Sequence, residues 1–143
     1  MSEKNKEVVR RIIDECFNNG NFKNLSQYFA KNYTFSEPTV PEGKGAEGFQ
    51  KLVSQYRIAF PDLNLTIERQ FEDGDTVITL WRSTGTHRGE LFGALPTGKY
   101  CTSHGVMISR MDNGKIIEGR QEWDVLGLMR QIGAIPMTIK TAA

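Results

Sequence analysis

The sequence predicts a single α+β domain. Three N-terminal helices would pack on a strongly curved, mostly antiparallel sheet, a cone-shaped α+β barrel, followed by a short C-terminal helix. Two observations predict this class. Apolar residues recur with a helical period up to about residue 60, and with a period of two from residue 63 onward. The chain has 143 residues, the length of one domain with one core, and no repeat divides residues 1–143.

The first helix is predicted over residues 3–18, because its apolar side chains form two adjacent i, i+4 rows on one face. These are Val8, Val9, Ile12, Ile13, Cys16 and Phe17. Gly20 suits the left-handed conformation that ends many helices. A short second helix is expected to begin near Phe22, and a third covers residues 45–60 and ends before Pro61. The second helix is predicted because Phe22, Leu25 and Phe29 have helical spacing.

The strands come mainly after the helices. Tyr33 and Phe35 suggest one short strand, and residues 37–45, with two Pro and two Gly, are predicted to form a loop. Four longer strands are then expected, joined mostly by hairpins: 63–71, 76–86, 99–111 and 115–123. A terminal helix is predicted over 125–131. Long strands curl, and helices across the concave face leave a conical interior that is a natural ligand pocket.

Composition excludes several classes of function. Eighteen Lys and Arg against 17 Asp and Glu give a net charge of +1, which argues against a nucleic-acid-binding surface. The apolar runs are too short to cross a membrane, and the polar start resembles no secretory signal. We therefore expect a cytoplasmic protein in which Cys16 and Cys101 are reduced and mostly buried.

Asp124 is the first candidate for chemistry. It directly precedes the terminal helix, where Asp is a favoured N-cap, and it could equally be a pocket carboxylate. Alternation along the last strand places Glu118, Arg120 and Glu122 on the same face as Asp124. Arg120 could hold an anionic or keto oxygen of a ligand, or pair with a neighbouring glutamate on a solvated face.

The histidines and aromatic residues provide further candidates. His104 shares a strand face with Tyr100, Val106 and Ile108, so it could donate to a substrate carbonyl, position Asp124, or be a core histidine with its hydrogen bonds satisfied. His87 ends a strand among glycines, where a capping or loop-ordering role competes with ligand contact. Apolar walls for a flat ligand, or alternatively ordinary core packing, would come from Trp81, Phe17, Phe29 and Phe49.

No metal site is predicted. Cys101 and His104 are three residues apart, so on a strand they point to opposite faces. The parity opposite to His104 would place Cys101, Met107 and Met111 on the outer face of the sheet. A semi-apolar outer face is typical of one covered by a second subunit, so we predict a homodimer.

Six stretches, in order, resemble the SnoaL-like polyketide cyclases (ester cyclases) of the nuclear transport factor 2-like superfamily. They are AFPDL (59–63), DGDTV (73–77), GTHRGE (85–90), PTGK (96–99), DNGKI (112–116) and WDVLGLMRQIG (123–133). The resemblance covers the chain from about residue 5 to 136. Two places depart from the family pattern. A histidine-containing stretch is replaced by Phe35-Ser36-Glu37-Pro38, and Arg120 replaces a common aromatic.

The resemblance implies a cofactor-free intramolecular aldol condensation of a polyketide methyl ester, a small hydrophobic carbonyl compound. One carboxylate would remove a proton from a carbon flanked by carbonyls and later protonate the new alkoxide. The family's carboxylate falls on Asp124. The alternatives are a small-molecule-binding or dimerisation module without catalysis, or a related isomerase or epoxide hydrolase on the same fold.

Overall fold

The structure is a computed structural model that describes residues 2–135. Its helices are α1 (Ser2–Ile12), the π-helical segment η1 (Ile13–Asn18) that continues it, α2 (Leu25–Tyr28), α3 (Gly45–Ala59) and α4 (Val125–Gln131). Its strands are β1 (Phe29–Glu37), β2 (Val40–Lys44), β3 (Asn64–Asp73), β4 (Thr76–Thr86), β5 (Tyr100–Asp112) and β6 (Lys115–Trp123). Within residues 2–135 no helix is both long enough and apolar enough to cross a membrane.

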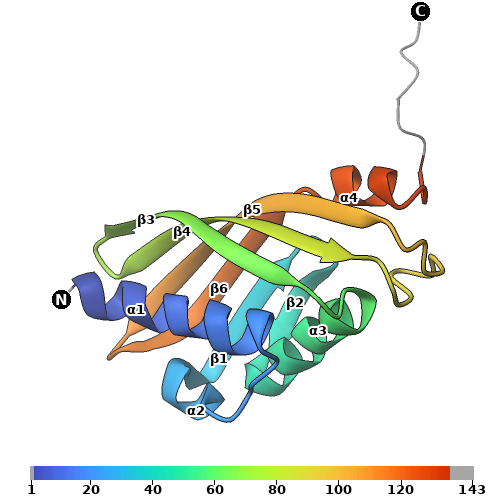
Figure 1. Cartoon of the computed structure of the whole chain (residues 1–143). Helices are drawn as coiled ribbons and strands as arrows, with labels where there is room; N and C mark the ends of the chain where they lie inside the picture. Colours follow the sequence, from blue (N-terminus) through green and yellow to red (C-terminus); the bar gives the residue numbers. More distant parts are fainter. Residues whose placement is uncertain (1, 136–143) are drawn as a thin grey trace, which may run out of the picture.

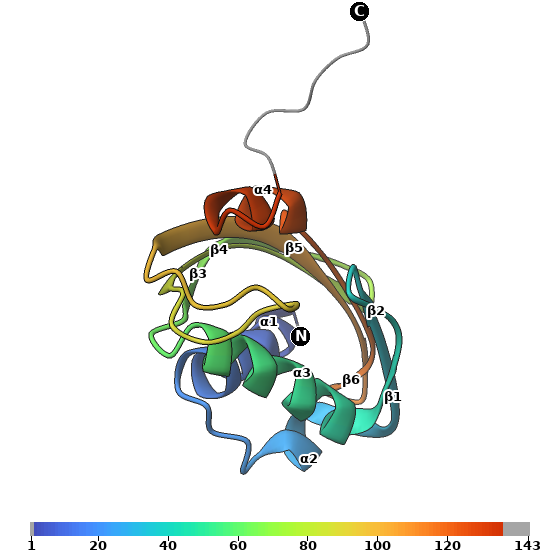
Figure 2. The ribbon, with the colours of Figure 1, turned by 90° about the vertical axis from the view of Figure 1, so that its right-hand side faces the viewer.

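One sheet of six strands, in the order β2-β1-β6-β5-β4-β3, forms the wall of the molecule. Every neighbouring pair is antiparallel except β1 and β6, which are parallel. The sheet curls without closing, and α1 and α3 lie on its concave side (Figures 1 and 2). The predicted α+β class with a strongly curved, mostly antiparallel sheet is therefore confirmed.

Two boundaries differ from the prediction. Residues 37–45 are not a loop: β1 continues to Glu37, and β2 pairs with it at the end of the sheet. Pro41 is tolerated there because an edge strand can do without one backbone N–H. Phe29 does not extend the second helix but begins β1, although it is buried as its apolar spacing suggested.

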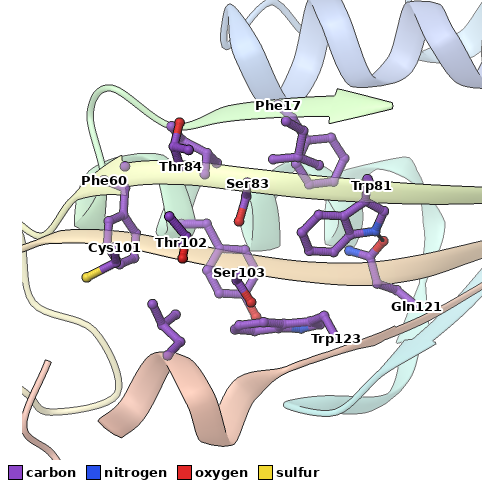
Figure 3. A pocket seen from close by; sticks show the side chains of 15 residues that line it. Phe17, Phe60, Trp81, Ser83, Thr84, Cys101, Thr102, Ser103, Gln121 and Trp123 are labelled. Carbon is purple, nitrogen blue, oxygen red and sulfur yellow. Dashed lines mark hydrogen bonds between the residues drawn. The ribbon is translucent and has the colours of Figure 1, made fainter. Parts of the chain in front are cut away.

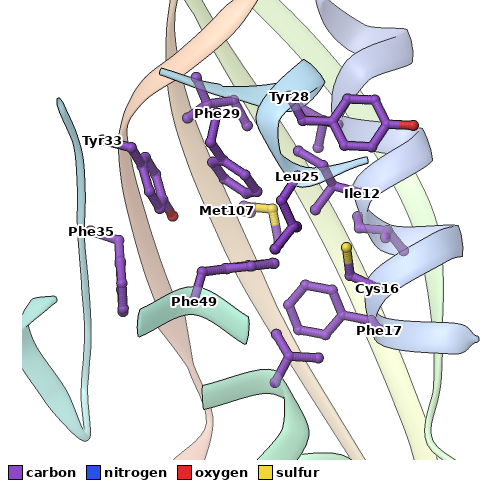
Figure 4. Close-up of a cluster of buried hydrophobic side chains, with 14 of the residues drawn as sticks. Ile12, Cys16, Phe17, Leu25, Tyr28, Phe29, Tyr33, Phe35, Phe49 and Met107 are labelled. Carbon is purple, nitrogen blue, oxygen red and sulfur yellow. The ribbon is translucent and has the colours of Figure 1, made fainter. Parts of the chain in front are cut away.

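The main core fills the concave side between the sheet and the helices (Figure 4). Phe49 of α3 lies at its centre, with ring centroids 5.8 Å from Phe17 and 4.8 Å from Phe29. Phe29 in turn packs on Tyr33 at 4.3 Å. Phe29 and Phe49 are therefore core residues, and both also line a second space in the interior.

The alternation of β5 runs opposite to the predicted one. Cys101, Met107 and Met111 are buried on the concave side, whereas His104 is exposed on the outer face. The prediction that His104 faces an apolar pocket is therefore wrong, as is the outer location of the other three residues. Apolar residues occur at both parities of this strand, and the packed helices decide which set turns inward. The homodimer stays a prediction, but Cys101, Met107 and Met111, on which it was based, do not lie on the outer face.

Candidate functional site

An apolar cavity opens between the concave face of β4, β5 and β6 and the helices α3 and α4 (Figure 3). The space free of protein atoms in and in front of it is about 520 Å³, a volume that includes space open to solvent. Aromatic and aliphatic side chains form most of its wall: Phe17, Tyr56, Phe60, Trp81, Trp123 and Leu128. Its polar side chains include Ser83, Ser103 and Gln121. A mostly apolar cleft with a few polar groups is the usual character of a small-molecule site.

Phe17 is held at this cavity by hydrogen bonds of the π-helical turn. The Asn18 side chain accepts from the Leu65 backbone N–H at 2.7 Å and donates to the Leu65 carbonyl at 3.0 Å. Arg57 of α3 donates to the Phe17 carbonyl oxygen at 2.7 Å. These bonds join the end of η1 to both β3 and α3, so the position of the Phe17 ring is fixed. The expected location of Phe17 in the pocket wall matches this geometry.

Trp81 crosses the floor of the cavity from β4 to β6. Its indole N–H donates to Gln121 Oε1 at 3.1 Å, although β5 lies between the two strands. The crossing requires a glycine below the ring, because a Cβ on Gly105 would lie 2.6 Å from Trp81 Cζ2. Trp123 stands on the other side of Gly105, where that same Cβ would lie 2.7 Å from Trp123 Cβ.

A second space lies around Phe35, Phe49 and Met107, and Gln121 lines both spaces. Beside it is a buried carboxylate that the sequence analysis did not single out. Glu37 is 5% exposed and accepts from Tyr56 Oη at 2.6 Å and from the Val40 N–H at 3.0 Å.

The Thr39 N–H also donates to Glu37. Burial, and then the hydrogen bond to Glu37, raise the pKa of Tyr56, so its phenol stays neutral. The helical position of Tyr56 indicated a buried ring, but no sequence spacing links residues 37 and 56.

Asp124 is the N-cap of α4. Its Oδ1 accepts from the Gly127 N–H at 2.9 Å, and a Cβ on residue 127 would lie 2.1 Å from Oδ2. The N-cap interpretation is therefore confirmed, and it explains the glycine three residues later. Asp124 is half-buried and follows directly on Trp123, but it is not among the residues that line the cavity. Its catalytic role stays a prediction.

The other polar candidates lie away from the cavity. Arg120 is exposed and pairs with Glu122 at 3.1 Å, so its guanidinium belongs to a solvated outer face. His87 is fully buried, and its Nδ1 lies 3.3 Å from the donating Thr97 N–H. His87 also packs on Phe60, with ring centroids 5.5 Å apart. This geometry favours the loop-ordering role of His87 over contact with a ligand.

Leu128 of α4 lines the cavity, and the loop of residues 87–99 passes close to α3 (Figure 2). The Gln131 side chain both accepts from the Thr102 N–H and donates to the Thr102 carbonyl, each at 2.8 Å. These bonds fix α4 to the part of β5 that extends beyond β6. From the loop, Phe92 meets the edge of Tyr56, with ring centroids 6.2 Å apart.

The arrangement suits the binding of a flat, apolar molecule that carries a few hydrogen-bonding oxygens. Burial raises the pKa of the Cys101 thiol, and this disfavours a nucleophilic thiolate at the cavity. The chemistry that remains for the polar side chains that line the cavity is hydrogen bonding to oxygen.

Comparison with known proteins gives a consistent result. Residues 7–132 match the family model of the SnoaL-like polyketide cyclases. Aklanonic acid methyl ester cyclase DnrD of Streptomyces peucetius is 28% identical over 130 residues, which cover 89% of each chain. Nogalonic acid methyl ester cyclase of Streptomyces nogalater is 29% identical over 121 residues, 82% of this chain and 90% of the relative.

Solved structures agree with the sequence relatives. A protein of Jannaschia sp. CCS1, described as SnoaL-like, superposes with a TM-score of 0.85 at 25% identity over 94% of both chains. A polyketide cyclase homologue of Acidithiobacillus ferrooxidans gives 0.82 at 29% identity, over 92% of this chain and 96% of the other. The family model spans most of the chain, and the fold is shared with these structures; the chain belongs to the SnoaL-like polyketide cyclase family of enzymes.

Proposed function

We propose that this cyclase closes a carbocyclic ring in a polyketide-like methyl ester by an intramolecular aldol condensation, without a cofactor. The observation that carries the proposal is the apolar cavity on the concave side, which is bounded by aromatic rings. Its relatives are named as cyclases of aklanonic and nogalonic acid methyl esters. A compound of that class is the substrate we propose here.

The cavity would accelerate the reaction mainly by confinement. A flexible chain held between Phe17, Trp81 and Trp123 is folded so that its acidic carbon approaches its own ketone. Because binding already restricts the chain to this orientation, little further conformational entropy is lost when the ring closes. The apolar wall also keeps water away from the carbanion, which would otherwise be protonated before the ring closes.

Asp124 is the acid/base group in this proposal. Asp124 Oδ1 accepts the helix-capping hydrogen bond from the Gly127 N–H. Asp124 Oδ2 has no hydrogen-bond partner among the described residues. Oδ2 would take the proton from the carbon between two carbonyls, and the enolate carbon would then bond to the ketone carbon. The resulting alkoxide takes the same proton back, so no atom or electron is gained or lost. The reacting carbon must therefore lie at the α4 end of the cavity, near Trp123 and Leu128.

The test is ring closure of aklanonic acid methyl ester and nogalonic acid methyl ester by the wild-type protein and by Asp124→Asn. Asn is as good an N-cap as Asp, so the melting temperature should change little. We expect the rate of ring closure to fall about 10²–10⁴-fold, the usual loss when a general acid/base is removed.

Asp124→Ala serves as the matched comparison, because it removes both the cap and the acid. Wild-type rates in Asp124→Asn would contradict the assignment of the base. Tight binding of both esters without turnover by the wild-type protein would indicate the alternative, a binding module without catalysis.

A further inference from the structure

The amide of Gln121 stands where the two spaces of the interior meet. Its oxygen is already used, since it accepts the Trp81 indole N–H at 3.1 Å. An indole nitrogen can only donate, so the atom facing it must be the amide oxygen. The Gln121 NH₂ group is consequently turned away from Trp81, and no described residue accepts a hydrogen bond from it.

Two features show that this orientation is built into the sheet. Trp81 is 4% exposed, and it can span β5 only because residue 105 has no Cβ to meet its ring. Without the indole, the amide could turn end over end and present either its oxygen or its nitrogen. Trp81 and Gly105 are therefore positioning residues, and what they position is a hydrogen-bond donor in an apolar cavity.

We propose that Gln121 Nε2 binds a carbonyl or enolate oxygen of the ligand and thereby selects ligands that carry an acceptor at this point. The inference rests on the proposed function in part, because an enolate is an intermediate of ring closure. Trp123, which lines the same cavity, has a second buried donor, since its indole N–H has no acceptor among residues 2–135. This N–H also favours ligands that carry an acceptor. An unpaired donor in an apolar site disfavours ligands that lack an acceptor.

Two rigid probes of the same shape test the proposal. Fluorenone and fluorene differ only in a carbonyl against a methylene at the bridge, and neither can undergo an aldol reaction. Dissociation constants by equilibrium dialysis should favour fluorenone about tenfold, the effect of about one net hydrogen bond. The carbonyl stretching band of bound fluorenone should also move to lower wavenumber than in an apolar solvent.

Gln121→Glu provides the decisive variant. A carboxylate still accepts the Trp81 N–H but has no N–H of its own, so the preference for fluorenone should fall well below tenfold, to the part that the Trp123 N–H supplies. Glu122→Gln is the control, because residue 122 lies next in the strand on the exposed outer face, and the preference should remain. Trp81→Phe, which releases the amide, should give an intermediate preference.

Equal affinities of the wild-type protein for the two probes would overturn the proposal, as would an unshifted carbonyl band or no binding of either probe. An unchanged preference in Gln121→Glu would overturn it too. The outcome does not depend on turnover: Asp124→Asn should keep the preference for fluorenone whether or not Asp124 proves to be the base.

Discussion

Replacement of Gly105 by Ala should disturb the interior strongly, because two of the three atoms nearest to the added Cβ belong to the backbone or lie next to it. The new Cβ would lie 2.6 Å from Trp81 Cζ2, 2.7 Å from the Glu122 carbonyl oxygen and 2.7 Å from Trp123 Cβ. Two of these atoms are backbone or near-backbone, so the indole of Trp81 has to move. Overpacking of this kind costs about 1–3 kcal/mol.

Movement of the indole also breaks its hydrogen bond to Gln121 and leaves a buried N–H without an acceptor. That loss adds about 1–3 kcal/mol, so the free energy of unfolding should fall by about 2–6 kcal/mol. Against a usual domain stability of about 5–15 kcal/mol this is a large effect. Urea unfolding followed by fluorescence is well suited, because the only two tryptophans of the chain are the two that contact this position.

Gly119→Ala is the matched control on the neighbouring strand. Its added Cβ would lie 3.1 Å from the Tyr33 hydroxyl and at ordinary contact distance from the Tyr33 ring, and the end of that side chain can shift slightly. We expect a change below about 1 kcal/mol for this variant, as for most tolerated substitutions. A Gly105→Ala protein that unfolds within about 0.5 kcal/mol of wild type would refute the argument that Trp81 is held across β5 by the missing side chain.

Three further predictions concern other parts of the structure. Tyr56→Phe should lower the free energy of unfolding by about 1–3 kcal/mol, because buried Glu37 loses one donor; little further loss in the Tyr56→Phe, Glu37→Gln double variant would confirm the coupling. Gln131→Glu should lose about 0.5–1.5 kcal/mol and speed amide exchange at Thr102, because it can accept but not donate there. Burial raises the pKa of Cys16 from the usual 9.0 to about 12, so its contribution to stability is constant below pH 9 and falls as the pH rises toward 12; wild type should therefore lose stability with pH more steeply than Cys16→Ala above pH 9.

Much of the fold could be predicted because periodicity reports the element type. Spacing predicts the helices and the four long strands, although the second helix begins at Leu25 and not near Phe22. The short edge strand β2 was missed because Pro41 and Gly43 usually mark loops, and only its place at the edge of the sheet makes them acceptable. Local residue preferences do not report that place.

The candidate site was harder to predict, since it depends on which face of each strand turns inward. His104, Val106 and Ile108 suggested one interior face for β5, whereas Met107 and Met111 occupy it. A shift of one residue exchanges the two faces completely, and a strand with apolar residues at both parities does not reveal the choice. Trp81 and Phe17 both pack in the core and line the cavity, so the two alternatives that the sequence left open for them coincide. The link from Trp81 to Gln121 requires knowledge of the strand order.

The central claim is that the concave cavity binds the carbonyl substrate, and filling that cavity tests it most directly. Ser83 is half-buried on the inner face of β4 and lines the cavity, while its neighbour Arg82 faces outward with its side chain 69% exposed. We predict that Ser83→Phe folds yet loses both fluorenone binding and ester cyclisation, whereas Arg82→Phe keeps both. Normal binding and cyclisation in a folded Ser83→Phe protein would contradict the account.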